Sequence, residues 1–409
     1  RKHTGGVRLA NLDDLISRVR AQIDPETVIG LARALIAVPS YTAAGELQAA
    51  EVLENFFKVA GIATRRQSVD DVGANVIATL PGKSEQVALL LNGHLDIVPP
   101  SAGMPYPPFE GVIRDNLLWG RGAVDMKGGL AAMACALAAL HATGMPLDRS
   151  VVLSAVASEE QGNRGTAALV REGIGAQWAV VGEATGLDLV IAHKGVDRYR
   201  VIVEGRAAHE SLPAHGKNAI VAAAHIITAL DRNLFPKMKE QSHPFLGHPT
   251  YNIGTIEGGI SRNTVPDRCM FQIAKRWLPG DSPAAIRAEL EEIIQAATGE
   301  TPVSLIREPD MERVAHPPLE LSPDHPLPRT LAATVEGVAA RAPALIGWPA
   351  FTDAALLQNA GVPALVFGPG DLNLAHSDRE CVPLSEVIAA AVVYATFAAV
   401  AANSSSEVL

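Results

Sequence analysis

Residues 91–100 read LNGHLDIVPP and directly continue the apolar run QVALL of residues 86–90. This run has the length and composition of a buried strand, and two proline residues end it. His94 and Asp96 lie at that end, two positions apart and therefore on the same side of an extended chain. An imidazole and a carboxylate at the mouth of a buried strand indicate a polar site at the edge of a sheet.

Strands and helices alternate on both sides of this stretch. Helical periodicity predicts helices over residues 26–37, 45–60, 126–144, 165–172 and 384–402, and apolar runs predict strands over residues 75–80, 87–93, 150–158, 177–183 and 363–370. The strands are apolar on both faces, which is typical of a sheet covered by helices. The pattern therefore predicts an α/β domain with a mostly parallel central sheet, formed by residues 1–193 and 312–409.

The pattern of polar and apolar residues changes after residue 193. KGVDRYRVIVEG alternates polar and apolar residues, as a half-exposed antiparallel strand does, and helix, strand, strand, helix and strand patterns follow. The order β-α-β-β-α-β predicts a ferredoxin-like α+β module over residues 194–311, inserted into the larger domain.

Composition excludes several functional classes. The 409 residues carry a net charge of -10 without a basic run, so we expect neither nucleic acid nor an anionic membrane as a partner. We expect no membrane span, and the N-terminal residues lack the apolar region of a secretory signal. Three cysteines without metal-type spacing predict reduced, buried thiols in a cytoplasmic protein.

Further metal-binding side chains follow other predicted strands or precede a predicted helix. They are Asp125 in GRGAVDMKGG, Glu159 and Glu160 in SEEQGNRGT, Glu183 in GEATG and His376 in AHSDRECVP. Each has an ordinary alternative, such as a helix cap, a structural histidine or a solvated acidic pair. Because ligands gather beyond the carboxyl ends of parallel strands, however, we expect these groups and His94 to converge at one edge of the sheet.

Charge arithmetic indicates what such a cluster would bind. Asp125, Glu160 and Glu183 supply three negative charges, and a bridging hydroxide a fourth, so two divalent ions would make the site neutral. Imidazole and carboxylate ligands suit zinc, with cobalt or manganese as substitutes. In this interpretation His94 binds metal, and Asp96 holds its other ring nitrogen.

These motifs, in this order, resemble those of the M20 metallopeptidase family, over nearly the whole chain. The family includes acetylornithine deacetylase, succinyl-diaminopimelate desuccinylase, aminoacylase-1 and glutamate carboxypeptidase. The resemblance implies one zinc on His94, Asp125 and Glu183. It implies a second zinc on Asp125, Glu160 and His376, with Asp125 as the bridge. It also implies that Glu159 is the general base, and that the peptide bond after Asp125 is cis.

The resemblance also gives the inserted module a role as lid and dimerisation domain. His209, in GRAAHESLPAHGKNAI, matches a histidine that reaches the partner subunit's active site and stabilises the oxyanion, although Glu210 replaces a more usual small residue. Asn263 and Arg276 match segments that bind the substrate carboxylate, for which the planar guanidinium of Arg276 is well shaped. Thr352, in FTDAALL, matches a loop near the substrate.

Together these features predict a homodimeric dizinc hydrolase that cleaves the amide bond of an N-acyl amino acid, of the deacetylase or desuccinylase type. A metal-bridging hydroxide would attack with the help of Glu159, and the small-molecule substrate would carry a free carboxylate. A carboxypeptidase or dipeptidase acting on small peptides is the close alternative. A catalytically inactive metal-binding sensor or scaffold of the same fold is the alternative from another class; the intact Glu159 argues against it.

Overall fold

The computed structural model describes residues 9–70, 73–299 and 301–404. The chain forms two compact units. Unit 1 comprises Arg1–Ile191, Leu321–Ile346 and Thr352–Leu409, and unit 2 comprises Ala192–Glu320 and Gly347–Phe351. Unit 2 contains all of the insertion predicted at 194–311, extends beyond it to Glu320, and takes in a short return segment.

A nine-stranded sheet contains the strands of unit 1, and its order is β1-β2-β6-β3-β7-β15-β8-β13, with β14 also paired to β8. Its end strand β13 belongs to unit 2. Their bounds are β1 Ala63–Val69, β2 Gly73–Leu80, β3 Ser84–His94, β6 Arg149–Val156, β7 Trp178–Val181, β8 Leu189–His193, β13 Leu319–Glu320, β14 Leu345–Trp348 and β15 Ala364–Val366. A smaller sheet contains β4 (Val112–Arg114), β5 (Leu117–Trp119) and β16 (Cys381–Pro383).

The large sheet is mixed, which corrects the expectation of a mostly parallel one. β6, β3, β7 and β15 are parallel, whereas β1, β2 and β8 join their neighbours in antiparallel pairs. The sequence could not indicate the direction of β2, because burial on both faces gives the same apolar pattern in a parallel and an antiparallel strand. All but two of its positions are buried. The parallel centre is the part that bears on the candidate site.

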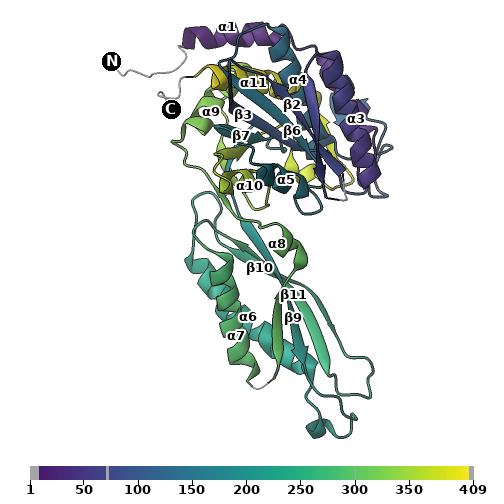
Figure 1. Ribbon diagram of the computed structural model, residues 1–409. Helices are drawn as coiled ribbons and strands as arrows, with labels where there is room; N and C mark the ends of the chain where they lie inside the picture. Colours follow the sequence, from purple (N-terminus) through teal and green to yellow (C-terminus); the bar gives the residue numbers. More distant parts are fainter. Residues whose placement is uncertain (1–8, 71–72, 300, 405–409) are drawn as a thin grey trace. The chain divides into compact units, whose positions relative to one another are not determined.

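Helices cover the sheet of unit 1 (Figure 1). They are α1 Leu9–Arg20, α2 Pro25–Ile36, α3 Ala43–Val59, α4 Gly128–Ala142, α5 Arg164–Glu172, α9 Pro326–Ala339, α10 Ala354–Asn359 and α11 Leu384–Asn403. α4 and α11 pack against each other and against β3 and β6. Two segments, Ala123–Ala142 and Leu384–Asn403, are long and apolar enough to span a membrane, but their apolar windows are 89% and 72% buried, as in helices of a protein core.

Unit 2 has the predicted order β-α-β-β-α-β. The elements are β9 Gly195–Glu204, α6 Ala219–Glu240, β10 Thr250–Gly258, β11 Arg268–Trp277, α7 Pro283–Thr298 and β12 Val303–Arg307, followed by the short helix α8 Pro309–Arg313. The sheet has the order β10-β11-β9-β12 and is antiparallel throughout. Its apolar face, with Val201 and Phe271, packs against Ile226 of α6 and Leu290 of α7. β10 forms one edge of this sheet.

Candidate metal centre

The parallel strands deliver the predicted groups to one edge of the sheet. His94 is the last residue of β3, and Glu183 follows β7 by two residues. Glu159 and Glu160 follow β6 in a turn that leads to α5. Asp125 lies in the turn before α4. Gly129 of α4 packs so closely on the chain after β7 that an added Cβ would lie 2.3 Å from the carbonyl oxygen of Gly182.

The first imidazole, of His94, is 1% exposed and faces two carboxylates. Its Nε2 lies 3.0 Å from Oδ1 of Asp125 and 3.4 Å from Oε1 of Glu183. Its Nδ1 lies 2.9 Å from the backbone oxygen of Asp96. Since a carbonyl oxygen only accepts hydrogen bonds, Nδ1 carries a proton, and Nε2 is the ring nitrogen that is placed to bind a metal ion.

The second imidazole, of His376, approaches the same carboxylates from the other side. Its Nε2 lies 2.8 Å from Oε1 of Glu160 and 3.1 Å from Oδ2 of Asp125. Asp125 therefore offers one oxygen to each imidazole. Ligand atoms of His94, Asp125 and Glu160 all lie within 4.8 Å of one another, close enough to hold one metal ion. The structure thus brings all five predicted metal ligands together.

The electrostatics of this cluster fit a cation. Burial and the neighbouring Asp125 carboxylate raise the pKa of Glu183 to about 7. Hydrogen bonds to Asp125 and Glu160 raise the pKa of His376 to about 10. The raised pKa values mean that Glu183 and His376 hold on to their protons, which lie between these side chains and the neighbouring hydrogen-bond acceptors. A divalent cation can take the place of those protons, because it neutralises the carboxylates and uses the imidazole lone pairs.

Asp96 plays a different part from the predicted one. Its backbone oxygen, and not its carboxylate, forms the hydrogen bond with His94; the nearer carboxylate oxygen is 3.6 Å from Nδ1. The carboxylate instead accepts the backbone N–H groups of Glu159 and Glu160, each at 3.0 Å. The N–H groups of Glu159 and Glu160 occupy both oxygens of the Asp96 carboxylate, so the backbone oxygen of Asp96 is the acceptor that meets His94.

Glu46 of α3 extends this arrangement and was not found from the sequence. Its Oε2 accepts the backbone N–H of Ser158 at 2.8 Å, so two buried carboxylates hold the three consecutive amides of residues 158–160. Ser158 has φ 59°, in the left-handed region that few non-glycine residues adopt. Glu46 lies 112 residues from Ser158 in a helix with an unremarkable amphipathic pattern, so no local signal marks it.

A buried ion pair supports the turn that carries Asp125. Arg121 donates to Glu380, and the two side chains are 1% and 0% exposed. The other carboxylate oxygen of Glu380 accepts the backbone N–H groups of Val124 and Asp125 at 3.3 and 3.4 Å. The peptide bond from Asp125 to Met126 is cis, as the resemblance implied.

Glu159 lies beside the cluster with its side chain held by Asn163. Its Oε1 accepts a hydrogen bond from Asn163 Nδ2 at 2.8 Å. Burial raises the pKa of Glu159 well above its usual range. Thr352 is only 2% exposed, and its hydroxyl accepts the backbone N–H of Ala354 at the start of α10.

The remaining predicted residues belong to unit 2. His209 is exposed, and its Nδ1 lies 2.8 Å from the Ser211 hydroxyl. Asn263 lies on the segment beside it, where its backbone oxygen accepts the N–H of Glu210. Arg276 is the next-to-last residue of β11 and is partly buried. Burial and the neighbouring Arg198 lower its pKa.

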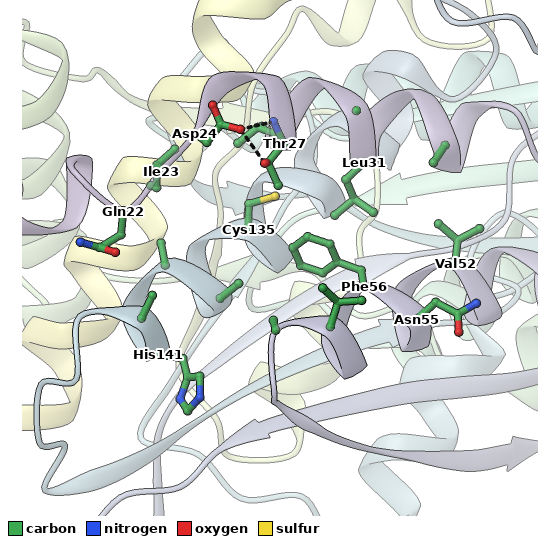
Figure 2. Close-up of a pocket in the computed structure, with 18 residues that line it drawn as sticks. Gln22, Ile23, Asp24, Thr27, Leu31, Val52, Asn55, Phe56, Cys135 and His141 are labelled. Atoms are coloured by element: carbon green, nitrogen blue, oxygen red, sulfur yellow. Dashed lines mark hydrogen bonds between the residues drawn. The ribbon is translucent and has the colours of Figure 1, made fainter.

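A large apolar pocket in unit 1 lies apart from these groups. It has a volume of about 780 Å³ and lies among α2, α3 and the second half of α4, with Leu31, Phe56 and Cys135 on its walls (Figure 2). Asp125 precedes the first residue of α4, whereas Cys135 and His141 belong to its later turns. None of the five predicted metal ligands lines this pocket.

Two imidazoles and three carboxylates thus meet at one edge of this sheet and form a candidate metal centre. Residues 90–400 match the model of the peptidase family M20/M25/M40. The chain belongs to this family, and it is a metal-dependent hydrolase that acts on amide bonds.

Curated relatives span most of the chain. Acetylornithine deacetylase of Myxococcus xanthus is 33% identical, over 81% of this chain and 86% of its own length. N-formyl-4-amino-5-aminomethyl-2-methylpyrimidine deformylase of Bacillus subtilis is 27% identical, over 77% of this chain and 80% of its own length.

Solved structures share the fold. Aminopeptidase PepT of Bacillus cereus has a TM-score of 0.77 at 24% identity, over 93% of this chain and all of that one. A Bacillus subtilis protein described as a dinuclear metal-binding peptidase from the M20 family has a TM-score of 0.69 at 16% identity, over 93% of this chain and 99% of that one.

Proposed function

We propose that the protein is a dizinc-dependent hydrolase that removes the acyl group from an N-acyl amino acid, in the manner of a deacetylase or desuccinylase. The observation that carries the proposal is the pair of imidazole Nε2 atoms, each of which faces two carboxylate oxygens at 2.8–3.4 Å. The similarity to an acetylornithine deacetylase at 33% identity supports the deacylase type, and the related dinuclear peptidase supports two ions.

The contacts suggest how two ions would be shared. His94, Asp125 and Glu183 would hold one, and Asp125, Glu160 and His376 the other, since each oxygen of Asp125 faces a different imidazole. Nitrogen and oxygen ligands of this kind suit zinc, with cobalt or manganese as substitutes. When bound, such ions polarise a carbonyl group and lower the pKa of water.

Glu159 would move the protons. It is buried beside the cluster but makes none of the imidazole contacts that Glu160 makes. A carboxylate in this environment can take a proton from the attacking water and give it to the departing amine, because burial raises its pKa and makes it a stronger base.

Unit 2 would recognise the free carboxylate of the substrate. Arg276 forms no ion pair with a carboxylate among the described residues, and its charge is opposed by Arg198 and Lys194. A guanidinium in such surroundings favours an anionic ligand, which it can bind with two parallel hydrogen bonds. We assign supporting contacts to Asn263 and Thr352.

Unit 2 would also form the homodimer and act as a lid. β10 is an edge strand, and Ile256 and Ile260 near its end are 53% and 91% exposed. Ile220 and Val221 on α6 are exposed as well. An open edge beside apolar side chains favours pairing with a second copy of the chain. In such a dimer His209 would reach the partner's site and stabilise the oxyanion.

A panel of N-acetyl, N-succinyl and N-formyl amino acids, with small dipeptides, tests the function in the presence of zinc or cobalt. We expect an N-acyl amino acid to be the best substrate. Fastest cleavage of dipeptides would instead identify a carboxypeptidase or dipeptidase, and no hydrolysis despite two bound metal ions would identify a sensor.

Matched variants test the residue roles. Glu159→Gln should keep both metal ions and lose turnover, whereas Glu160→Gln should lose metal. Retention of most activity by Glu159→Gln would refute the general-base role. Inactive Glu159→Gln and His209→Ala dimers should regain activity when their subunits are exchanged. Failure to regain it, with exchange verified, would refute a contribution of His209 across the interface.

A further inference from the structure

The side chain of Glu159 is the first member of a chain of buried hydrogen bonds. Asn163 Nδ2 donates to Oε1 of Glu159 at 2.8 Å and to Oδ1 of Asp353 at 2.9 Å. The second oxygen of Asp353 accepts the Thr166 hydroxyl at 2.8 Å. Asn163, Thr166 and Asp353 are 4%, 0% and 1% exposed, so water does not compete for these bonds.

The chemistry of the two carboxylates fixes the orientation of the Asn163 amide. When Glu159 is ionised, as a general base must be before it acts, and Asp353 is ionised as well, both carboxylates only accept hydrogen bonds, so the Asn163 amide between them must present its nitrogen to both. Rotating the amide by half a turn would place its oxygen against two carboxylates. Asp353 therefore excludes the alternative orientation of Asn163, and this keeps a donor aimed at Glu159.

The backbone of Asn163 is tied to the same residue. Its N–H donates to the backbone oxygen of Glu159 at 2.9 Å, and its φ of 56° lies in the left-handed region, which asparagine adopts more readily than most residues. Asn163 thus bonds both the main chain and the side chain of Glu159.

We propose that Asn163 and Asp353 are positioning residues for Glu159: Asn163 fixes the reactive carboxylate, and Asp353 fixes Asn163. This inference rests on the proposed function of Glu159 as general base. Among the described residues, the Asp353 carboxylate accepts hydrogen bonds from an amide and a hydroxyl, both neutral, and burying a carboxylate in this way costs stability that an apolar residue would not cost. A role of Asp353 in fixing Asn163, and through it the geometry of Glu159, explains why a buried carboxylate stands at this position.

Three variants separate positioning from general support of the fold. Asn163→Gly deletes the amide while allowing the left-handed backbone. Asn163→Asp keeps the shape but replaces the donor with an acceptor. Asp353→Asn lets the Asn163 amide turn over. The control is Thr334→Val, which removes a buried hydroxyl that donates to the Thr330 carbonyl oxygen within α9.

The readouts are kcat, KM, metal content and the unfolding midpoint, measured on the zinc-loaded protein with the best substrate of the panel. Misplacing a proton-transfer group can cost on the order of 100-fold in rate. We expect all three variants to lose about 10- to 100-fold in kcat, with KM within about 3-fold and both metal ions retained. Thr334→Val should leave kcat unchanged.

A double variant tests most directly whether Asn163 and Asp353 act together on Glu159. If the two residues act as one unit, Asn163→Gly with Asp353→Asn should lose no more kcat than the worse single variant. Multiplying losses, or losses that follow metal content or stability, would overturn the proposal, as would wild-type kcat in any folded Asn163 variant. Should Asp353→Asn not fold, Asn163→Gly and Asn163→Asp decide alone. An active Glu159→Gln would refute the general-base role on which this inference rests, whereas an inactive Glu159→Gln beside normal Asn163 variants would refute only the positioning.

Discussion

The buried ion pair between Arg121 and Glu380 allows a quantitative test of what holds the Asp125 turn. Glu380→Gln preserves the shape of the side chain and one acceptor oxygen, but it removes the charge that compensates Arg121. Because Arg121 is 1% exposed, its guanidinium cannot turn to water without opening the core of unit 1. The variant therefore isolates the cost of one unpaired buried charge.

Removing one partner of such a pair costs about 3–5 kcal/mol, whereas exposed pairs are worth roughly 0–1 kcal/mol. The side chains of Arg121 and Glu380 are almost fully inaccessible, so the larger figure applies. Lys83 and Asp148, which pair at 2.8 Å with side chains 70% and 56% exposed, provide the control. Asp148→Asn should cost under about 1 kcal/mol.

Urea unfolding of the metal-free proteins, followed by circular dichroism, measures both costs. The double variant Arg121→Met with Glu380→Gln should be less destabilised than the sum of its single variants by about 2 kcal/mol, since no charge is left unpaired. The reasoning is refuted if Glu380→Gln costs no more than Asp148→Asn, or if the two single costs simply add.

Three further predictions follow from other buried groups. Glu46→Leu should destabilise unit 1 by about 1–3 kcal/mol, because the Ser158 amide loses its acceptor, while Glu46→Gln should cost less; equal costs in urea unfolding would contradict this. Burial lowers the pKa of His316 to about 4, below its unfolded value, so the stability that unit 2 gains from a neutral His316 should be lost as pH falls from about 6.5 towards 4. Urea titrations of the wild type and His316→Gln should diverge over that range, and parallel curves would contradict the assignment. Cys135, Cys269 and Cys381 are 5%, 1% and 5% exposed, so a thiol reagent should label them only after unfolding; rapid labelling of the native protein would refute their burial.

The sequence made the candidate ligands predictable because position along a strand translates directly into position in space. His94 and Glu183 follow apolar runs, and the carboxyl ends of parallel strands meet at one edge, so their convergence needed no knowledge of distant contacts. The direction of each strand was harder to predict from the sequence. β2 is buried on both faces although it is antiparallel to its neighbours, and the apolar pattern is the same in either direction.

The supporting groups were not predictable for a different reason. Glu46, Asn163 and Glu380 act through hydrogen bonds to backbone amides or to side chains brought near by the fold, and their own neighbourhoods in sequence are ordinary. Asp96 shows the same limit at short range. Its proximity to His94 was visible, but whether its carboxylate or its backbone would meet the imidazole depended on the amides of Glu159 and Glu160.

The insertion of unit 2 has a consequence for the order of synthesis. β15, which lies between β7 and β8 in the large sheet, comes from residues 364–366, and His376 comes later still. A nascent chain on the ribosome therefore exposes the unpaired edges of β7 and β8 until translation is nearly finished, while the continuous segment Ala192–Glu320 has long been available to fold. The centre acquires its last imidazole only at that late stage, so premature termination would yield a protein that lacks both a central strand and a complete set of ligands.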